Sequence, residues 1–249
     1  MRTAGSAAQE LLPKPLQVAR QVLDRATVLG LSGAVEAYVQ VGRTTELKVF
    51  AGRAESVQVG EPRGLGVRFI SRRRLGYAYT SDFSTTGLDQ VLLAAAANAE
   101  EADPDPFLDL PAGDYRYVEI PGLWQPGVAR TTLADKLALV LAAEKAAYRV
   151  PGVTAVEESL YSDVDLSLAV ASTAGVAVEA ELSHCVLYVM AHAGEGKERQ
   201  SGQGFSAGRD PAELDAESAG GEAGERARSL LGASPCETGV RTVVLAREV

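Results

Sequence analysis

The sequence predicts an α+β fold, with largely antiparallel mixed sheets and packed helices arranged as two α+β layers. Two long regions, 34–80 and 153–193, consist of segments in which apolar and polar residues alternate, as in half-buried strands. Stretches with apolar residues three or four positions apart precede, separate and follow these regions, as expected for helices. Short connections between neighbouring strands favour antiparallel pairing over the long crossovers of a parallel sheet.

The composition is that of a globular protein without a surface dedicated to polyanions. Of the 249 residues, 46% are hydrophobic and 23% are charged, which is typical of soluble domains. The net charge of −9 argues against a nucleic-acid partner or an anionic membrane surface. No apolar run approaches the roughly 20 residues that span a bilayer, and the first residues lack the apolar core of a secretory signal. We therefore expect a cytoplasmic protein.

The first elements are a helix and a series of strands. A helix is expected to begin at Pro15, since proline suits the first helical turn, and to end at Gly30. Alternation then predicts strands at 35–41, 45–51 and 53–59, the last two joined by a tight turn. Together with the hairpin that follows, these segments predict up to five strands in a row.

The stretch 64–83, GLGVRFISRRRLGYAYTSDF, predicts a β-hairpin that leads into a helix. Two alternating runs, 65–70 and 75–80, flank a polar connection. The triple arginine Arg72–Arg74 within it is expected to be a solvated tip rather than a phosphate-binding patch. Ser84 is suited to cap the next helix, whose apolar positions continue to Ala99.

The middle of the chain is predicted to cross the surface. The DPDP segment at 103–106 ends the preceding helix, because each proline also restricts the residue before it. The following residues, up to 130, are rich in proline and glycine, and Trp124 is expected to anchor them by packing. A second helix is predicted to begin at Thr132, which offers a partial capping box with Asp135.

The second half of the chain repeats the alternation of strands and helix. Strands are expected at 153–162, 164–172, 176–182 and 184–193, and the glycine-rich stretch 197–208 is either an edge strand or a mobile loop. A last helix is predicted from Asp215 to Gly232, with internal glycines that permit close packing against a neighbour. A strand-like run follows at 241–246.

This order of elements predicts the domain organisation. An N-terminal α+β domain is expected at 1–110, a linker or crossover at 111–130, and a second α+β region at 131–239. Residues 240–249 are expected to begin a C-terminal domain that is absent from the sequence.

Residue types that carry chemistry are few. His184 and His192 share a face of a predicted strand but stand about 26 Å apart along it, so they cannot share a metal unless the strand bends. Cys185 and Cys236 form no metal-binding pattern and are expected to be buried free thiols. Because neighbouring strand residues point to opposite faces, no thiolate–imidazole pair is expected between Cys185 and His184.

No catalytic constellation is evident in the sequence. Glu195 and Glu198 form a small polar cluster with His192, without a fixed geometry, while Glu157 and Glu158 are expected on solvated surface. No glycine-rich loop opens a helix as phosphate cradles require. The sequence therefore predicts no catalytic, cofactor-binding or metal-ligating residue in this chain.

Several short motifs follow one another in a characteristic order. They are AVEAY at 34–38, the hairpin at 64–83, DPDPFLDLP at 103–111, STAG at 172–175, RQSG at 199–202, the helix at 220–231 and TG at 238–239. In this order and spacing they resemble the TldD/PmbA family, whose members are historically called modulators of DNA gyrase and are related to metallopeptidases. The resemblance covers nearly the whole chain.

The resemblance implies where the metal chemistry of the family resides. Family members are about twice this length, and this chain is similar to their N-terminal half. In the catalytic paralogue an HExxxH helix and a later cysteine hold zinc, and no position of this chain matches them. The DPDPFLDLP break and the TGVRTVVLAREV ending look more like the PmbA (TldE-like) paralogue, which lacks the metal ligands. Zinc is thus expected on a partner subunit or in missing sequence, and no cofactor in this chain.

The function implied by the resemblance is that of a non-catalytic subunit of a zinc-dependent peptidase complex. Its substrates would be unfolded or extended peptides, and its partner a TldD-like catalytic subunit or a second copy of itself. Two alternatives stay open. The chain could be the front half of the catalytic subunit, with its zinc site in missing sequence, or a non-enzymatic regulatory or binding module.

Overall fold

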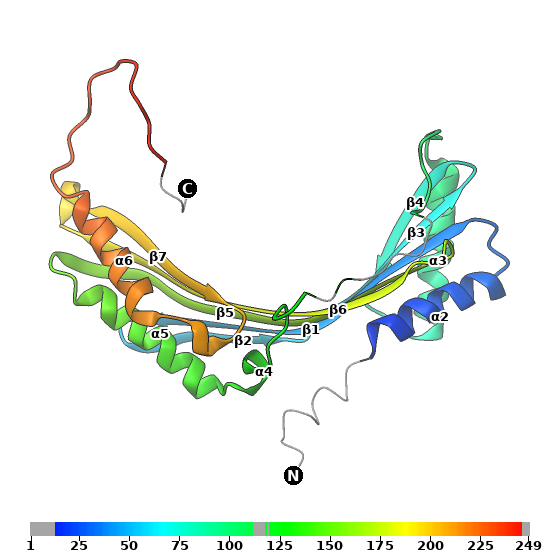
Figure 1. Cartoon of the computed structure of the whole chain (residues 1–249), viewed down its shortest axis with the longest axis horizontal. Helices are drawn as coiled ribbons and strands as arrows, with labels where there is room; N and C mark the ends of the chain where they lie inside the picture. The colour runs from blue at the N-terminus through cyan, green and yellow to red at the C-terminus, as the bar shows by residue number, and fades with distance from the viewer. Residues whose placement is uncertain (1–12, 112–117, 119, 246–249) are drawn as a thin grey trace, which may run out of the picture.

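The computed structural model describes residues 13–111, 118 and 120–245 of the chain. Its centre is one seven-stranded antiparallel sheet with the order β4-β3-β1-β5-β6-β7, in which β2 pairs with the second part of β1. Figure 1 shows that the sheet is long and curved like a trough, with helices against its convex side. The α+β class that the alternation predicts is confirmed.

Three strands run along most of the sheet, and the others extend it at either end. The long strands are β1 (Ala34–Phe50), β5 (Val153–Ser172) and β6 (Ala177–Ala193), and the short ones are β2 (Arg53–Gly60), β3 (Arg63–Ser71), β4 (Arg74–Thr80) and β7 (Gln200–Gly208). Since β1 pairs with both β3 and β5, strands from the two halves of the sequence belong to the same sheet. The domain boundaries expected at 110, 130 and 239 stay a prediction.

The long strands correct the prediction of shorter ones. Segments 35–41 and 45–51 form one strand because the polar residues between them pair with 164–166 of β5, so their backbone groups remain satisfied. The expected breaks at 163 and at 183 are likewise internal to β5 and β6. Asp163 and Ser183 are buried there, and each has polar partners.

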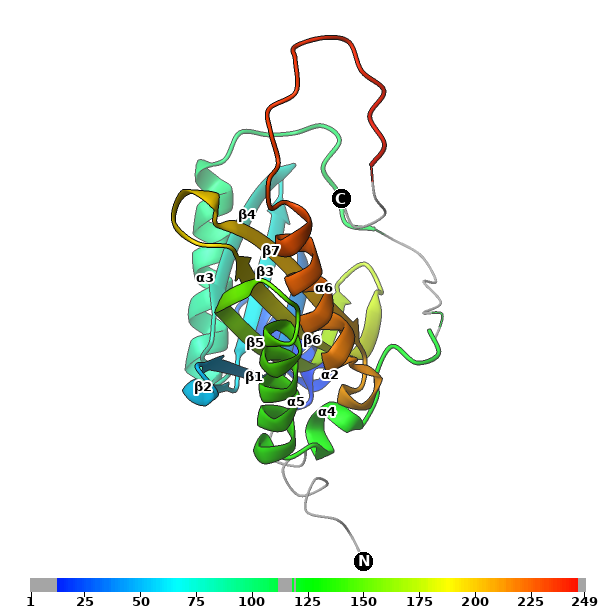
Figure 2. The same cartoon turned by 90° about the vertical axis from the view of Figure 1, so that its left-hand side faces the viewer.

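The helices begin and end close to the predicted positions. They are α2 (Pro15–Val28), α3 (Thr85–Glu101), the short α4 (Gly127–Arg130), α5 (Leu133–Tyr148) and α6 (Ala216–Ser229), with 3₁₀ turns at Gly196–Glu198 and Pro211–Glu213. The Ser84 and Thr132 hydroxyls accept hydrogen bonds from the backbone N–H groups of Gly87 and Asp135, as expected for N-caps. Figure 2 shows α5 and α6 side by side in front of the strands.

The apolar core lies between the helices and one face of the sheet. Along β1 the odd-numbered residues from Val35 to Val49 are buried except Arg43, and the even-numbered residues between them are more exposed except Gly42. At one end this face packs against α2 and α3, and at the other end against α5 and α6. A side chain added at Gly220 would lie 2.0 Å from the Ala143 carbonyl oxygen of α5, and one added at Gly224 would lie 2.6 Å from the Val150 side chain, which confirms the predicted close packing of the last helix.

The structure also decides two predictions about strands near the end of the chain. The stretch at 200–208 is an edge strand, β7, and not a loop. The strand predicted at 241–246 is wrong over its described part, because 241–245 pair with no strand and are exposed, while 246 lies outside the described residues. An extended apolar segment is a strand only when its backbone groups pair with a neighbouring strand, and these residues pair with none.

The arginine tip of the hairpin is solvated as predicted, but it also makes contacts. Arg72 and Arg73 are exposed and have positive φ angles of 52° and 60°. The guanidinium groups of Arg73 and Arg74 donate hydrogen bonds to the carbonyls of Pro106 and Glu100. The tip therefore holds the end of α3 and the DPDP segment. No helix in the described parts of the chain is long and apolar enough to cross a membrane.

Candidate functional site

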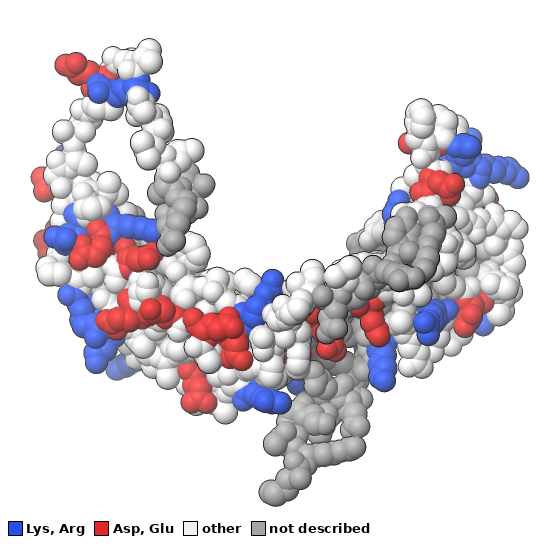
Figure 3. All heavy atoms as spheres, in the orientation of Figure 1, with Lys and Arg blue, Asp and Glu red and all other residues white. Residues whose placement is uncertain are grey.

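The concave face of the sheet carries none of the described helices, which pack against its convex side. Figure 3 shows a hollow between two arms, and Figure 1 shows the curved strands that form its floor. Directly paired residues of neighbouring antiparallel strands share a face, so the even-numbered residues of β1 and their partners line this hollow. A surface of this shape can receive another polypeptide.

Apolar side chains occupy the middle of the concave face. Leu168 of β5 pairs with Gln40 of β1, and Leu166 pairs with Leu182 of β6, which places both leucines on this side. They are half-buried, and no apolar cluster of the described core includes them. The predicted alternation of leucines and polar residues in this strand is present, but here the polar side faces the helices.

A tyrosine-lined hollow of about 650 Å³ lies at one end of the same face. Tyr38, Tyr77 and Tyr79 line it, with exposed fractions of 41%, 53% and 79%. A side chain added at Gly66 would lie 2.9 Å from the Tyr77 hydroxyl, so glycine lets this tyrosine lie against β3. Exposed aromatic rings beside backbone groups are typical of surfaces that bind peptides.

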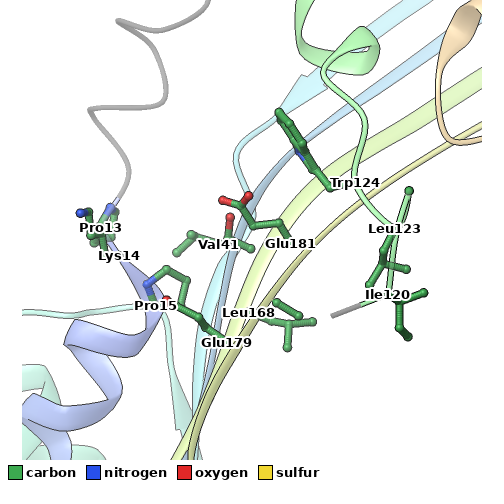
Figure 4. Close-up of a pocket in the computed structure, with 13 residues that line it drawn as sticks. Pro13, Lys14, Pro15, Val41, Ile120, Leu123, Trp124, Leu168, Glu179 and Glu181 are labelled. Carbon is green, nitrogen blue, oxygen red and sulfur yellow. The ribbon is translucent and has the colours of Figure 1, made fainter. Parts of the chain in front are cut away.

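A second cavity, of about 820 Å³, lies where the start of α2 faces the loop at 120–124 across the sheet. Figure 4 shows Glu179 and Glu181 on the strands between Lys14 on one side and Trp124 on the other. Trp124 Nε1 donates a 2.9 Å hydrogen bond to Asp165 Oδ1. The tryptophan anchors the crossover, as predicted, and also lines the cavity.

A buried polar cluster also lies on the helix-bearing face of the sheet. The Lys136 ammonium of α5 forms an ion pair with the Asp163 carboxylate, which also accepts a 2.6 Å hydrogen bond from the Tyr161 hydroxyl. The Thr45 hydroxyl lies 3.5 Å from the Lys136 ammonium. Burial, followed by the hydrogen bond to Asp163, raises the pKa of Tyr161. The Tyr161 phenol therefore stays protonated and does not transfer protons. The cluster instead connects α5 to the sheet.

Burial is also the main cause of the raised pKa values of two other groups, the Asp165 carboxyl and the Cys185 thiol. It raises the pKa of Asp165, while the hydrogen bond from Trp124 and the charge of Arg43 act in the opposite direction. It raises the pKa of the Cys185 thiol to about 12. A thiol with such a pKa is a poor nucleophile at neutral pH, so Cys185 is a structural residue.

The structure separates most of the residues that the sequence singles out. His184 is exposed and Cys185 is buried on the opposite face of β6, as predicted. His192 is 7% exposed and contacts Glu157 and Ser201, not the expected Glu195 and Glu198.

The two cysteines differ in environment. Cys236 is exposed, which corrects the prediction of two buried thiols, because it lies in the extended segment after α6. Glu158, expected on solvated surface, forms an ion pair with Lys48 at 3.0 Å.

Within the described residues, no three side chains of histidine, cysteine, aspartate or glutamate lie close enough together to hold a metal ion. Zinc sites in peptidases need three protein ligands and an open position. The donor set that the structure describes therefore does not fit zinc, and no step of a mechanism is assigned to a metal on these residues.

Two consecutive family models match the chain, and both describe domains of metallopeptidases. The PmbA/TldA metallopeptidase domain 1 matches residues 35–99, and the PmbA/TldA metallopeptidase central domain matches residues 127–231. The chain belongs to the PmbA/TldD family, which confirms the resemblance seen in its motifs. A comparison with curated proteins gives no match.

Three solved structures have a fold similar to that of this chain. A candidate modulator of a DNA gyrase from Thermotoga maritima has a TM-score of 0.76 and 19% identity, over 90% of this chain and 50% of that one. A candidate modulator of DNA gyrase from Bacteroides thetaiotaomicron has a TM-score of 0.78 and 19% identity, over 90% and 51%. TldE from Thermococcus kodakarensis has a TM-score of 0.70 and 18% identity, over 85% and 46%. The chain thus spans about half the length of these proteins.

Proposed function

We propose that this chain shapes the peptide-receiving cavity of a zinc-dependent peptidase assembly and contributes no metal ligand to it. Two observations support the proposal. The chain carries the first and central domains of a metallopeptidase family, and its described residues provide no set of ligands for zinc. Zinc is accordingly assigned to a TldD-like catalytic partner, where it would activate the hydrolytic water.

The observation that carries the proposal is the open concave face. Half-buried leucines at its centre and exposed tyrosines at its end leave apolar surface uncovered by the described helices. Apolar surface of this kind marks sites of contact with another polypeptide. An unfolded or extended substrate exposes apolar side chains and backbone groups, and the leucines and tyrosine hydroxyls of the face can contact them.

The test is a cleavage assay with a purified TldD-like subunit and an unstructured peptide. We expect cleavage to increase when this chain is added, and a Tyr38→Ser, Tyr79→Ser variant to lose most of that increase. Val28→Ser, on the exposed side of α2, is the matched control because it also removes an exposed apolar side chain. Equal cleavage with and without the wild-type chain would contradict the proposal.

A further inference from the structure

One group of side chains on the concave face has no role in the proposed function. His192 of β6 lies between Ser201 of β7 and Glu157 of β5. The Ser201 Oγ is 3.0 Å from His192 Nδ1, and the Glu157 Oε2 is 2.5 Å from His192 Nε2. A hydroxyl, an imidazole and a carboxylate in this order are the parts of a nucleophile–base–carboxylate relay.

The fold of the three strands explains how the group forms. His192 and Ser201 are directly paired residues of antiparallel strands, so their side chains share a face. On the other side, β5 has an irregularity between Val156 and Glu158, which leaves Glu157 without a register partner. A β-bulge redirects the side chain of its extra residue, and here it brings Glu157 to His192.

The three side chains of this group differ in their exposure to solvent. His192 is 7% exposed, whereas Ser201 is an exposed residue and the Glu157 side chain is 61% exposed. The imidazole is thus held by both hydrogen bonds with little contact to water, while the hydroxyl is open to an incoming molecule. Either ring nitrogen can accept a proton, since the two exchange roles between tautomers.

We propose that Ser201, His192 and Glu157 form a hydrolytic site for activated esters of apolar acyl groups. The Ser201 Oγ attacks the ester carbonyl carbon while its proton passes to His192 Nδ1. The Glu157 carboxylate stabilises the imidazolium through Nε2. The imidazolium then gives its proton to the departing alkoxide or phenolate, which leaves an acyl-serine. Water attacks this ester with His192 as the base, and the products are the carboxylic acid and the free Ser201 hydroxyl.

The surroundings of Ser201 supply the other requirements of this chemistry. In the described structure β7 pairs only with β6, so alternate backbone N–H groups of β7 point away from the sheet and can stabilise an oxyanion. Phe205 lies four residues further along the same strand, on the same face, and is 48% exposed. It stands about 13 Å from Ser201 at ~3.3 Å per residue, within reach of a long acyl chain.

The experiment measures two signals on the chain alone, without any partner subunit. A fluorophosphonate probe reports a nucleophilic serine, located by mass spectrometry, and a p-nitrophenyl ester of a medium-length fatty acid reports turnover. We expect labelling of Ser201 and ester hydrolysis that a metal chelator leaves unchanged. This last result separates the site from the zinc-dependent function proposed above, so each can fail without the other.

Three variants distinguish a relay from a purely structural contact. Ser201→Ala is expected to abolish labelling, and His192→Gln to reduce labelling and hydrolysis by about 10²–10⁴-fold, the usual contribution of a general base. Glu157→Gln should lower the hydrolysis rate while leaving a labelled serine. Ser81→Ala, at another exposed serine, is the control and should change neither signal.

Unfolding midpoints of the variants show whether each one retains the fold. Wild-type protein that is labelled no more than folded Ser201→Ala would overturn the proposal. Labelling confined to another serine would overturn it as well.

Discussion

Lys136 and Asp163 form an ion pair that is almost entirely removed from water, with side-chain exposures of 6% and 2%. The pair joins α5 to the middle of β5, and Tyr161 satisfies the same carboxylate with a second hydrogen bond. Burying a charge costs much less free energy when the charge is paired and hydrogen-bonded in this way. The pair explains why a strand with an aspartate at its centre continues without a break.

Removing one member of this pair should destabilise the protein strongly. We expect Asp163→Asn and Lys136→Ala each to lower the free energy of unfolding by about 3–5 kcal/mol, since each leaves an uncompensated group in the interior. The free energy of unfolding of a Lys136→Met, Asp163→Leu double variant should be closer to the wild-type value than that of either single variant, because neither charge remains in the interior. Urea unfolding followed by circular dichroism measures all three.

The exposed ion pair between Arg149 and Glu217 is the matched control for this series, with side-chain exposures of 53% and 70%. Glu217→Ala should cost about 1 kcal/mol or less, as is usual for surface pairs. Equal losses at the buried and the exposed pair would contradict the assignment of α5 docking to Lys136 and Asp163.

Asp165 should make the stability of the protein depend on pH. Burial raises the pKa of this carboxyl above its ordinary value of 3.8, so the folded chain holds the proton more tightly than the unfolded one. The contribution of Asp165 to stability is therefore complete below 3.8 and is lost as the pH rises through the folded pKa.

Asp165→Asn removes this titration and keeps an acceptor for the Trp124 indole. The difference in unfolding free energy between Asp165→Asn and the wild type should grow in favour of the variant as the pH rises from below 3.8 to neutrality. Chemical unfolding at several pH values measures it. A difference that stays constant with pH, or that shrinks, would contradict the prediction.

Gly76 sets the distance between β4 and α3. A side chain added there would lie 1.8 Å from the Ala95 carbonyl oxygen and 2.5 Å from the Ala99 backbone nitrogen, so the helix would have to move. We expect Gly76→Ala to lower the free energy of unfolding by about 1–3 kcal/mol or more, the usual cost of overpacking.

Gly64, on the neighbouring strand β3, is the control because a side chain added there meets no atom within 4 Å. Gly64→Ala should leave the urea midpoint almost unchanged. A comparable loss in both variants would show that the contact with α3 is not what requires glycine at position 76.

The two thiols should differ sharply in reactivity. Cys236 is exposed, whereas Cys185 is buried and burial raises its pKa to about 12. A thiol-specific chromogenic disulfide should therefore modify one cysteine per folded chain and both in denaturant. Cys236→Ser should abolish the fast reaction, and rapid modification of both thiols in the folded protein would contradict the burial of Cys185.

The elements of the fold could be predicted largely from local pattern. The helix that begins at Pro15, the cap at Thr132 and the hairpin at 64–83 all follow from side-chain periodicity and from residues that suit a terminus or a turn. The continuity of β1 and β5 could not be predicted this way. Whether Asp163 interrupts a strand depends on Lys136 of α5, and the sequence pattern does not show how this preceding helix folds back onto the strand.

The hollows and the polar groups were harder to predict than the elements. Tyr77 and Tyr79 belong to a recognised hairpin, but the hollow that they line also needs Tyr38 of β1. His192, Glu157 and Ser201 stand on three strands, and the bulge that turns Glu157 toward the imidazole has no evident signal in the sequence. Pairing register, not residue type, brings them together.

The amino-acid sequence by itself determined the α+β class, the helix boundaries and the family motifs, because these depend on interactions between residues close in the chain. Only the tertiary structure decided that one curved sheet joins the two halves and that its concave face remains open. It also decided which polar groups meet. These features depend on how distant strands align and on which side the helices pack, and both result from burying apolar surface while giving buried polar groups partners.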